Sequence, residues 1–253
     1  MHLHNENCIP VLQRIPANSI DLLLTDPPYN LGSFMRTRNT NLNAMRPNFF
    51  GSAGWDDLNE TEWEASMNEF FRESARVVRK GGAFIVFMSI IKVETLIKIA
   101  TSHGLYYKTT GIWHKTNPMP RNMNLHFINS TEAWVYFINN KKDETDKLHI
   151  RTGTYNNNNL ALHDFIESPI ISPAERREGK HPTQKPLSLM EHFVQILSNP
   201  GDTIMDPFMG SGTTGVAAKK LQRNFIGSET RTDYYKIAVS RITNAAEIIA
   251  NAQ

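Results

Sequence analysis

The amino-acid sequence predicts an α/β fold in which a mostly parallel sheet is covered by helices on both faces. Short apolar runs that end at turn residues alternate with longer stretches of helical spacing, as expected of parallel strands joined by helices. The chain has 253 residues, 40% hydrophobic and 21% charged, which is an ordinary globular composition. A chain of this length buries a sizeable core without disulfides or a structural metal, so we expect one domain over residues 1–253.

The first half of the chain begins with a predicted buried strand over residues 19–26, because its apolar run ends abruptly at Pro27-Pro28. A helix is expected next. Thr61-Glu-Trp-Glu64 fits a capping box, and apolar residues recur at helical spacing as far as Val78, until Gly81-Gly82 ends the run. The elements expected after it are a strand over 83–88, a helix over 91–103, a strand over 106–113 and a strand over 132–139.

In the second half, regular patterns return at Pro186. The expected elements are a helix over 186–197, a strand over 203–206, a helix over 213–221, a strand over 224–228 and a helix over 232–250. Residues 31–58 and 140–180 carry no clean period, and we interpret them as a mobile loop and a variable, loop-rich insertion. His2 and His4 are expected to lie in a disordered tail, since no further metal ligands follow at suitable spacing.

Composition narrows the class of protein. Cys8 is the only cysteine, which excludes an internal disulfide, argues against a thiolate zinc site and predicts a reducing, cytoplasmic setting. The N-terminus lacks a signal pattern and the apolar runs are too short to span a bilayer, so no membrane association and no metal are expected. A net charge of +2 does not by itself indicate a polyanion partner. Arginines nevertheless cluster in two candidate phosphate-contacting stretches, residues 31–50 and 156–185.

A glycine-rich turn lies between the predicted strand at 203–206 and the helix that follows. Gly210-Ser-Gly-Thr-Thr-Gly215 matches G-x-G-x-x-G, and the acidic Glu229 follows Gly212 by seventeen positions. Glycines let the backbone approach a ligand closely, and a carboxylate at the end of the next strand can accept hydrogen bonds from both ribose hydroxyls. The pattern fits an adenosine-containing cofactor, with a tight structural turn as the alternative.

Asp26-Pro-Pro-Tyr29 stands at the exit of the first strand. Taken singly, the aspartate would cap a turn and the tyrosine would pack in the core. Together they fit the activation of an exocyclic amine, whose lone pair is delocalised into its ring. If the Asp26 carboxylate and the Pro27 carbonyl each accept an N–H, the lone pair is freed and developing positive charge is stabilised. The Tyr29 ring can then stack on an extruded base.

With these motifs in this order, the chain resembles the β-class DNA amino-methyltransferases that use S-adenosylmethionine, in which the catalytic tetrapeptide precedes the cofactor loop. Asp26-Pro-Pro-Tyr29 resembles the catalytic motif and Asp206-Pro-Phe-Met-Gly-Ser-Gly212 the cofactor loop. His181-Pro-Thr-Gln-Lys-Pro186 is similar to the stretch ahead of that loop, and Ile112–Pro118 to the segment that flanks the flipped base. The similarity runs from about Asn5 to Arg241 and is greatest to bacterial adenine-N6 enzymes.

The resemblance implies a Rossmann-like methyltransferase fold with circularly permuted motif order, a single catalytic domain over 1–253, a DNA-facing loop at 31–58 and a target-recognition insertion at 140–180. It implies S-adenosylmethionine as cofactor, DNA as substrate, and a homodimer and a cognate restriction endonuclease as partners. The implied catalytic residues are Asp26, Pro27, Pro28 and Tyr29. The implied cofactor-binding residues are Asn7, Cys8, Asp26, His181, Thr183, Lys185, Asp206, Phe208, Gly210, Ser211, Gly212, Thr213 and Glu229. The implied DNA contacts are Arg36, Arg38, Arg46, Lys115, Asn117, Arg121, Arg176 and Arg177.

Two departures from the family pattern and one assembly hypothesis accompany the resemblance. Asn7 stands where the family often has an aspartate that touches the cofactor adenine, so an acceptor is kept and a charge is lost. The stretch over 140–180 is short for a recognition domain, so residues 31–50 are expected to share target reading. The apolar residues of 62–79 and 91–103 serve the core and are also candidates for a dimer interface burying more than ~1,000 Å².

The target is predicted to be the N6 amine of adenine in DNA, because in the family Asp before the two prolines is usual for adenine and Ser for cytosine. Cytosine-N4 is the alternative, followed by an RNA or protein amino-methyltransferase, whose relatives usually carry Asn there and place the cofactor loop first. An oxidoreductase would leave Asp26-Pro-Pro-Tyr29 without a role. A DNA-binding protein that had lost activity would be expected to lack the acid or the glycines, and both are present.

Overall fold

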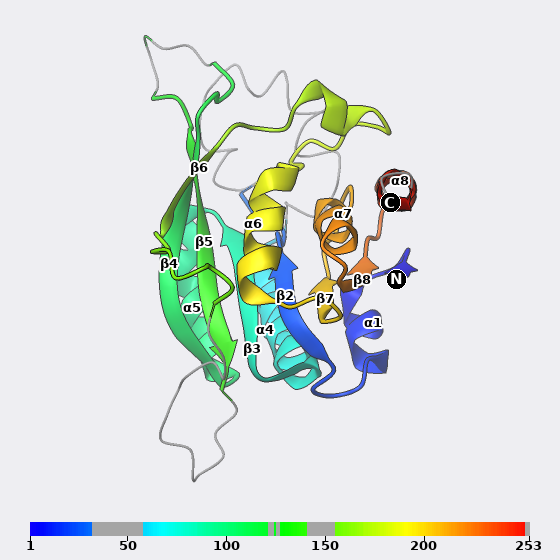
Figure 1. Cartoon of the computed structure of the whole chain (residues 1–253). Helices are drawn as coiled ribbons and strands as arrows, with labels where there is room; N and C mark the ends of the chain where they lie inside the picture. Colours follow the sequence, from blue (N-terminus) through cyan, green and yellow to red (C-terminus); the bar gives the residue numbers. More distant parts are fainter. Residues whose placement is uncertain (32–57, 121–123, 125–126, 141–154, 251–253) are drawn as a thin grey trace.

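In the computed structural model, the described residues (1–31, 58–120, 124, 127–140 and 155–250) form a three-layer αβα fold built on one eight-stranded sheet (Figure 1). The strands are β1 (His2–His4), β2 (Ile20–Thr25), β3 (Val78–Met88), β4 (Leu105–Lys115), β5 (Thr131–Asn139), β6 (Phe165–Ser168), β7 (Thr203–Asp206) and β8 (Asn224–Ser228). Their order across the sheet is β1-β8-β7-β2-β3-β5-β4-β6. Every neighbouring pair is parallel except the two that include β5, so the mostly parallel sheet predicted from the sequence is confirmed.

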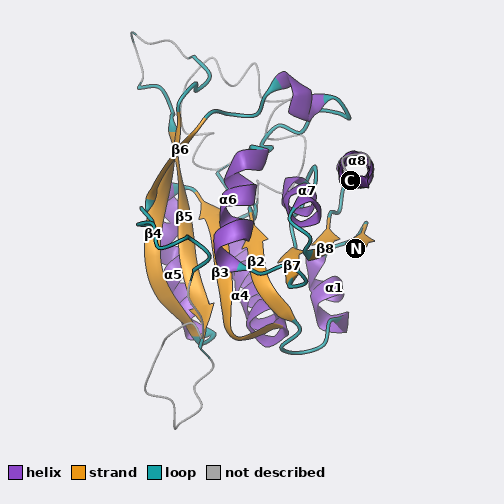
Figure 2. Ribbon diagram, viewed as in Figure 1, coloured by secondary structure: helices purple, strands orange, loops and turns teal. Residues whose placement is uncertain are grey.

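Helices cover both faces of this sheet (Figure 2). On one face lie α1 (Cys8–Arg14), α4 (Glu60–Val77) and α5 (Val93–Ser102), and on the other lie α6 (Leu187–Leu197), α7 (Thr213–Lys220) and α8 (Thr232–Ala250). Short 3-10 turns, Ile90–Lys92 and Pro173–Arg176, precede α5 and α6 along the chain. Each face buries its own apolar core, which is why the central strands read as continuous apolar runs.

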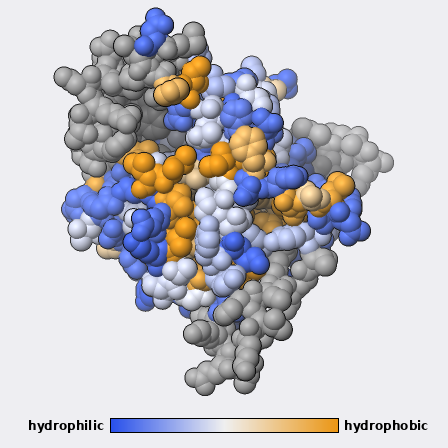
Figure 3. Space-filling model, turned by 90° about the vertical axis from the view of Figure 1, so that its left-hand side faces the viewer, coloured by the Kyte–Doolittle hydropathy of each residue, from blue (hydrophilic) through white to orange (hydrophobic). Residues whose placement is uncertain are grey.

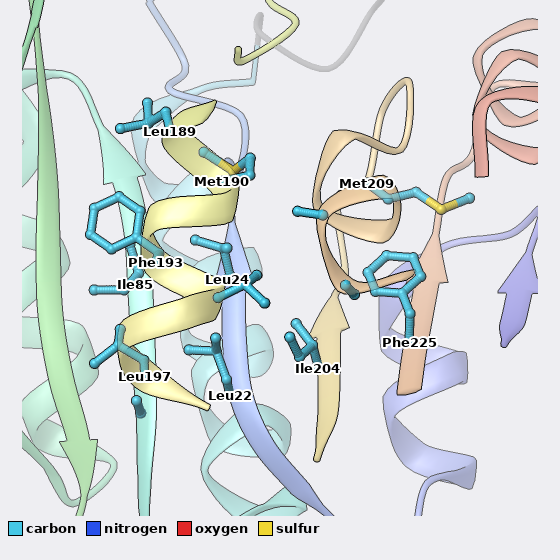
Figure 4. Close-up of a cluster of buried hydrophobic side chains, with 14 of the residues drawn as sticks. Leu22, Leu24, Ile85, Leu189, Met190, Phe193, Leu197, Ile204, Met209 and Phe225 are labelled. Atoms are coloured by element: carbon cyan, nitrogen blue, oxygen red, sulfur yellow. The ribbon is translucent and has the colours of Figure 1, made fainter. Parts of the chain in front are cut away.

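The core under α6 is formed where one side of this helix packs on one face of the sheet. Leu189, Phe193 and Leu197 recur on one side of α6 and point at the sheet (Figure 4). They pack against Leu22 and Ile85, which face the same side of β2 and β3 and are fully buried. Burying such side chains contributes about 1.5–3 kcal/mol each, so this contact fixes α6 against β2 and β3.

The structure corrects the predicted bounds of the first long helix. Its capping box is formed by Asn59 and Glu62, two residues earlier than predicted, since the Asn59 side chain accepts from the Glu62 amide at 2.9 Å. The helix ends at Val77, and β3 starts at once and passes through the two glycines that were predicted to separate helix from strand. Gly81 has φ +74°, and the register between β2 and β3 shifts beside it. The glycines therefore accommodate an irregularity within a strand rather than a break before it.

Several other elements differ from the sequence prediction. His2–His4 form β1, an edge strand paired with β8, and are not a disordered tail. The strands β4 and β5 pair directly as antiparallel neighbours, so strand and helix do not alternate throughout. Strand β6 and a 3-10 turn lie inside the stretch interpreted as loop-rich, whereas residues 141–154 of it and residues 32–57 of the predicted DNA-facing loop lie outside the described residues.

Most apolar residues of the two helices proposed as a dimer interface are buried in the core of the protein. Trp63, Met67, Phe70 and Phe71 of α4 are all at most 3% exposed. Apolar surface gathers instead on the face that carries the β4–β6 edge of the sheet (Figure 3), where Phe165 is 51% exposed and stacks on His114. No described helix combines the length and the apolar character needed to cross a membrane.

Candidate active site

Three acidic residues lie at the carboxyl ends of three adjacent parallel strands. Asp26 follows β2, Asp206 ends β7 and Glu229 follows β8. Because parallel neighbours end at the same edge of a sheet, all three line one cavity of about 520 Å³. The cavity unites residues from the start and the end of the chain, as the permuted order of motifs predicts.

The glycine-rich loop between β7 and α7 forms one wall of this cavity. Gly210 and Gly212 have φ +51° and +77°, left-handed values that favour glycine, and a side chain on Gly212 would place its Cβ 2.9 Å from that of Ala238. Behind the loop, the buried Arg241 of α8 donates to the Ser211 carbonyl at 2.7 Å and to the Thr213 hydroxyl at 3.0 Å. Ser211 and Thr213 therefore hold the shape of the loop through contacts within the protein.

The Asp206 carboxylate is buried and fully hydrogen-bonded to neutral donors. It accepts from the Thr25 and Thr214 hydroxyls, each at 2.7 Å, and from the Phe208 amide at 3.2 Å. Burial raises the pKa of Asp206 to about 6 in spite of these bonds. The side chain thus ties the ends of β2 and β7 and the start of α7 together.

Asp26 stands in a cluster of charged groups. The Lys185 ammonium bonds to Asp26 Oδ2, and the Tyr29 hydroxyl donates to Asp26 Oδ1 at 2.6 Å. Lys185 also lies 3.2 Å from Glu132 Oε2, and Glu132 Oε1 lies 2.6 Å from the Lys115 ammonium. The cluster alternates in sign from Lys115 through Glu132 and Lys185 to Asp26, and two of its members, Asp26 and Lys185, line the cavity.

The electrostatics of this cluster follow from burial and mutual attraction. Burial raises the pKa of Asp26, the Lys185 ammonium opposes that rise, and the Glu132 carboxylate reinforces it. Burial also pushes the pKa of Glu132 upward, but Lys185 and Lys115 outweigh it and leave that pKa below its usual range. Burial lowers the pKa of Lys185, whereas its two carboxylate partners raise it above the ordinary value. The ammonium of Lys185 is therefore retained in the site.

The tetrapeptide backbone is held from α4. The Trp63 indole N–H donates to the Pro28 carbonyl at 2.9 Å. The Lys92 ammonium lies over the buried Trp63 ring, 4.9 Å from the ring centre. The hydrogen bond from Trp63 leaves the Pro28 carbonyl occupied and fixes the chain direction just before Tyr29.

Comparison with known proteins decides the family. A family model described as DNA methylase matches residues 20–240. The chain is 30% identical over 237 residues to the Type II methyltransferase M2.LlaDCHI of Lactococcus lactis subsp. cremoris, covering 93% of this chain and 87% of that protein. The chain belongs to the N6/N4 DNA methylase family. It is also 32% identical over 243 residues to the Type II methyltransferase M.HinfI of Haemophilus influenzae, covering 93% of this chain and 66% of that protein.

Solved structures agree with this assignment. A crystal structure of M1.HpyAVI in complex with S-adenosylmethionine is 27% identical and superposes with a TM-score of 0.70, covering 95% of this chain and 98% of that one. The cytosine-N4-specific PvuII DNA methyltransferase is 18% identical with a TM-score of 0.72, covering 99% of this chain and 93% of that one, which shows the shared fold. The Rossmann-like methyltransferase fold is thereby confirmed, and this methylase uses S-adenosylmethionine.

The residues that line the cavity fit this cofactor. Phe208 contributes an aromatic ring, which packs edge-on against Phe70 with the ring centres 5.3 Å apart. Glu229 contributes a carboxylate, and burial raises the pKa of that carboxylate. The buried His181 Nδ1 has no hydrogen-bond partner among the described residues, and burial lowers the pKa of His181 to about 4, so the ring is neutral. Thr183 also lines the cavity. The wall thus combines apolar surface with a few polar atoms, as small-molecule sites do.

Asn7 and Cys8, predicted to bind the cofactor, lie at the start of α1 and line the same cavity. The Asn7 side chain caps the helix by accepting from the Ile9 amide at 2.9 Å. Burial raises the pKa of Cys8 to about 12, so its thiol stays protonated. Both therefore shape the wall, with Asn7 engaged in a local structural bond.

The predicted DNA-contacting residues fall into three groups. Arg36, Arg38, Arg46 and Arg121 lie outside the described residues. Arg176 and Arg177 are exposed at the 3-10 turn before α6. The Asn117 side-chain oxygen, Oδ1, accepts from the Ile170 backbone amide at 2.7 Å. Lys115 lies in the charged cluster against Glu132 rather than on an open surface.

Sequence reasoning missed Glu132, Trp63 and Arg241 as parts of the site. Glu132 lies in a strand and Trp63 in a helix, and each was interpreted only as part of its element. Arg241 acts from α8 on the back of the cofactor loop. The one local signal was Glu132 itself, a charged residue at the start of an otherwise apolar strand.

Proposed function

We propose that this DNA methylase transfers the methyl group of S-adenosylmethionine to the N6 amine of adenine in DNA. The observation that carries the proposal is the position of Asp26. Asp26 directly follows the end of β2 and lines the same cavity as the glycine-rich loop. An amine brought to Asp26 would lie beside the cofactor site. Asp before two prolines is the family pattern of adenine enzymes.

The chain's own residues supply orientation and electrostatics. Asp26 and the Pro27 carbonyl accept the two N–H groups of the target amine, which frees its lone pair and stabilises positive charge on nitrogen. The Tyr29 ring stacks on the extruded base, and Trp63 keeps the tetrapeptide in place through Pro28. The cofactor supplies an electrophilic methyl group, and Phe208, Glu229 and His181 are the residues proposed to hold it.

Cytosine-N4 is the second candidate, because its amine presents the same N–H groups beside a ring nitrogen and the family contains both activities. The PvuII enzyme, which shares the fold, is named as specific for cytosine N4. The deciding experiment is incubation of unmethylated DNA, RNA and protein with tritiated cofactor, followed by nucleoside mass spectrometry of the labelled pool. N6-methyladenine in DNA is the expected product. N4-methylcytosine, or label in RNA or protein, would overturn the adenine assignment.

We also propose a cognate endonuclease, a homodimer and a cytoplasmic location for this methylase. Both curated relatives are named Type II methyltransferases, which supports a cytoplasmic role in protecting DNA from a cognate endonuclease. Exposed Arg176 and Arg177 are proposed phosphate contacts, together with Arg36, Arg38, Arg46 and Arg121. A homodimer is proposed to supply further surface for the duplex. Light scattering showing only a 28.8 kDa species with and without DNA would exclude it.

A further inference from the structure

Glu132 is a second carboxylate placed directly behind Asp26. It comes from the start of β5, belongs to none of the motifs that define the site, and is joined to Asp26 through the shared Lys185 ammonium. The Tyr29 hydroxyl also lies between the two acids, 2.6 Å from Asp26 Oδ1 and 3.4 Å from Glu132 Oε2. The Lys185 side chain is only 8% exposed, so these charges interact with little screening.

The arrangement raises a problem of charge. Asp26 and Lys185 alone would form a neutral pair, and an ammonium beside the reaction centre would oppose the positive charge that develops on the target amine. Glu132 adds a second negative charge next to Lys185. Lys115 pairs with the other oxygen of Glu132, Oε1, at 2.6 Å, and its ammonium lies 5.1 Å from the centre of the Trp113 ring. The charged groups that act on Asp26 are Lys185 and Glu132, and not Lys115, so at Asp26 two carboxylates share one ammonium.

We propose that Glu132 is a positioning residue of the methyl-transfer reaction: it holds Lys185 and keeps the trio of Asp26, Glu132 and Lys185 net negative where the amine becomes positive. As the new N–C bond forms, the sulfonium S–C bond breaks and its electron pair stays on sulfur. The methylated amine is then cationic until it loses a proton to Asp26, from which the proton passes to water. The inference rests on the proposed function, since it requires an amine at Asp26.

The same geometry predicts how Asp26 titrates. The groups that face Asp26 are Lys185, Tyr29 and Glu132, with Asp206 on the neighbouring strand. The Glu132 charge raises the pKa of Asp26. Removing that charge should lower the pKa of Asp26, because a repulsive neighbour is lost while the attractive Lys185 remains.

The first test compares Glu132→Gln, Glu132→Asp and the double variant Glu132→Gln/Lys185→Met. At saturating cofactor, we expect Glu132→Gln to lower kcat at least ~10-fold, the order expected for one unit charge within ~8 Å at an effective dielectric of 20. Glu132→Asp should recover part of the loss. The double variant removes one charge of each sign, restores the net negative charge and should exceed Glu132→Gln in kcat. A double variant no faster than Glu132→Gln would overturn the proposal.

The matched control is Glu191→Gln, which removes a paired carboxylate from α6, where Glu191 lies 2.5 Å from the Lys220 ammonium of α7. It should leave kcat unchanged, and thermal melting should show that all variants are folded. In the pH profile of kcat, Glu132→Gln should move the acidic limb to lower pH as well as lowering the plateau. A lower plateau with an unmoved limb would mean that Glu132 only supports the structure.

A second measurement separates this inference from the proposed function. Carbon-13 NMR of labelled aspartate carboxyls, assigned with Asp26→Asn, can follow the titration of Asp26 in the DNA-free protein. The pKa of Asp26 should be lower in Glu132→Gln than in the wild type, and an equal or higher value would overturn the inference whatever the substrate is. Failure of the wild type to methylate adenine would instead reject the proposed function and leave this result standing.

Discussion

Asp26 and Asp206 occupy equivalent places at the ends of two adjacent strands, yet their surroundings differ in kind. Asp206 on β7 receives its hydrogen bonds from two threonine hydroxyls and a backbone amide, all fixed and uncharged. Asp26, after β2, receives them from the charged Lys185 and from the Tyr29 hydroxyl. Thr25, the residue before Asp26, itself donates to Asp206. The donors to Asp206 are uncharged groups of the strand and the loop, whereas the donors to Asp26 are side chains of the charged cluster. We therefore expect Asp26, and not Asp206, to exchange a partner for a substrate.

The largest effect that this comparison predicts is the loss of Asp26. Asp26→Ala should lower methyl transfer by at least ~100-fold, the range for removing a positioned catalytic group, because the target amine loses its acceptor. Initial rates with tritiated cofactor measure this. Calorimetric titration should show that cofactor binding is only mildly weakened, since Phe208 and Glu229 remain in place. Turnover close to that of the wild type would contradict the mechanism.

The environment of Asp206 can be tested by measuring the free energy of unfolding as a function of pH. The pKa of Asp206 is raised from its ordinary value of 3.8 to about 6 in the folded protein, so the folded state binds a proton that the unfolded state has released. The contribution is fully present below about pH 4 and is lost as pH rises through about 6. Relative to Asp206→Asn, the free energy of unfolding of the wild type should fall by roughly 3 kcal/mol across that window.

Denaturant melts of both proteins between pH 4 and 7 measure this difference, in which other titrating groups cancel. Thr214→Val is the matched control, because it removes one donor to Asp206 and should raise the pKa of Asp206 further, extending the loss to higher pH. A difference between the wild type and Asp206→Asn that stays constant with pH would show that Asp206 titrates normally.

The two aspartates also show what could be predicted from the sequence. Both strand ends were predictable, because a short apolar run that stops at Pro27-Pro28 or at the glycine-rich loop marks its own boundary. The cavity followed from the rule that parallel strands end at one edge. The different roles of the two acids were not predictable, because the donors around Asp206 come from Thr25 and Thr214, which are far apart in sequence.

The elements that escaped prediction have the same origin. Strand β1 has three residues and no period, and it exists only because it pairs with β8 from the far end of the chain. Glu132 appears in the sequence only as a charged residue near the start of a mostly apolar strand. Its meaning depends on Lys115, Lys185 and Asp26, which three separate segments bring to it. Local patterns define elements well, whereas charged clusters depend on tertiary contacts.

Substitutions of Tyr29, which is hydrogen-bonded to Asp26, are expected to have the smallest effect. The sequence suggests a stacking ring, while the structure adds a hydroxyl that donates to Asp26 Oδ1 at 2.6 Å. Tyr29→Ala should cost about 1–3 kcal/mol in kcat/KM through lost stacking on the base. Tyr29→Phe keeps the ring and should stay within about 3-fold of the wild type, because Lys185 still holds Asp26 and the freed Oδ1 remains an acceptor. Losing the hydroxyl removes a bond that lowers the pKa of Asp26, so the acidic limb of the rate profile should move to higher pH in Tyr29→Phe. The opposite ranking of the two variants would mean that the hydroxyl, and not the ring, is what the reaction uses.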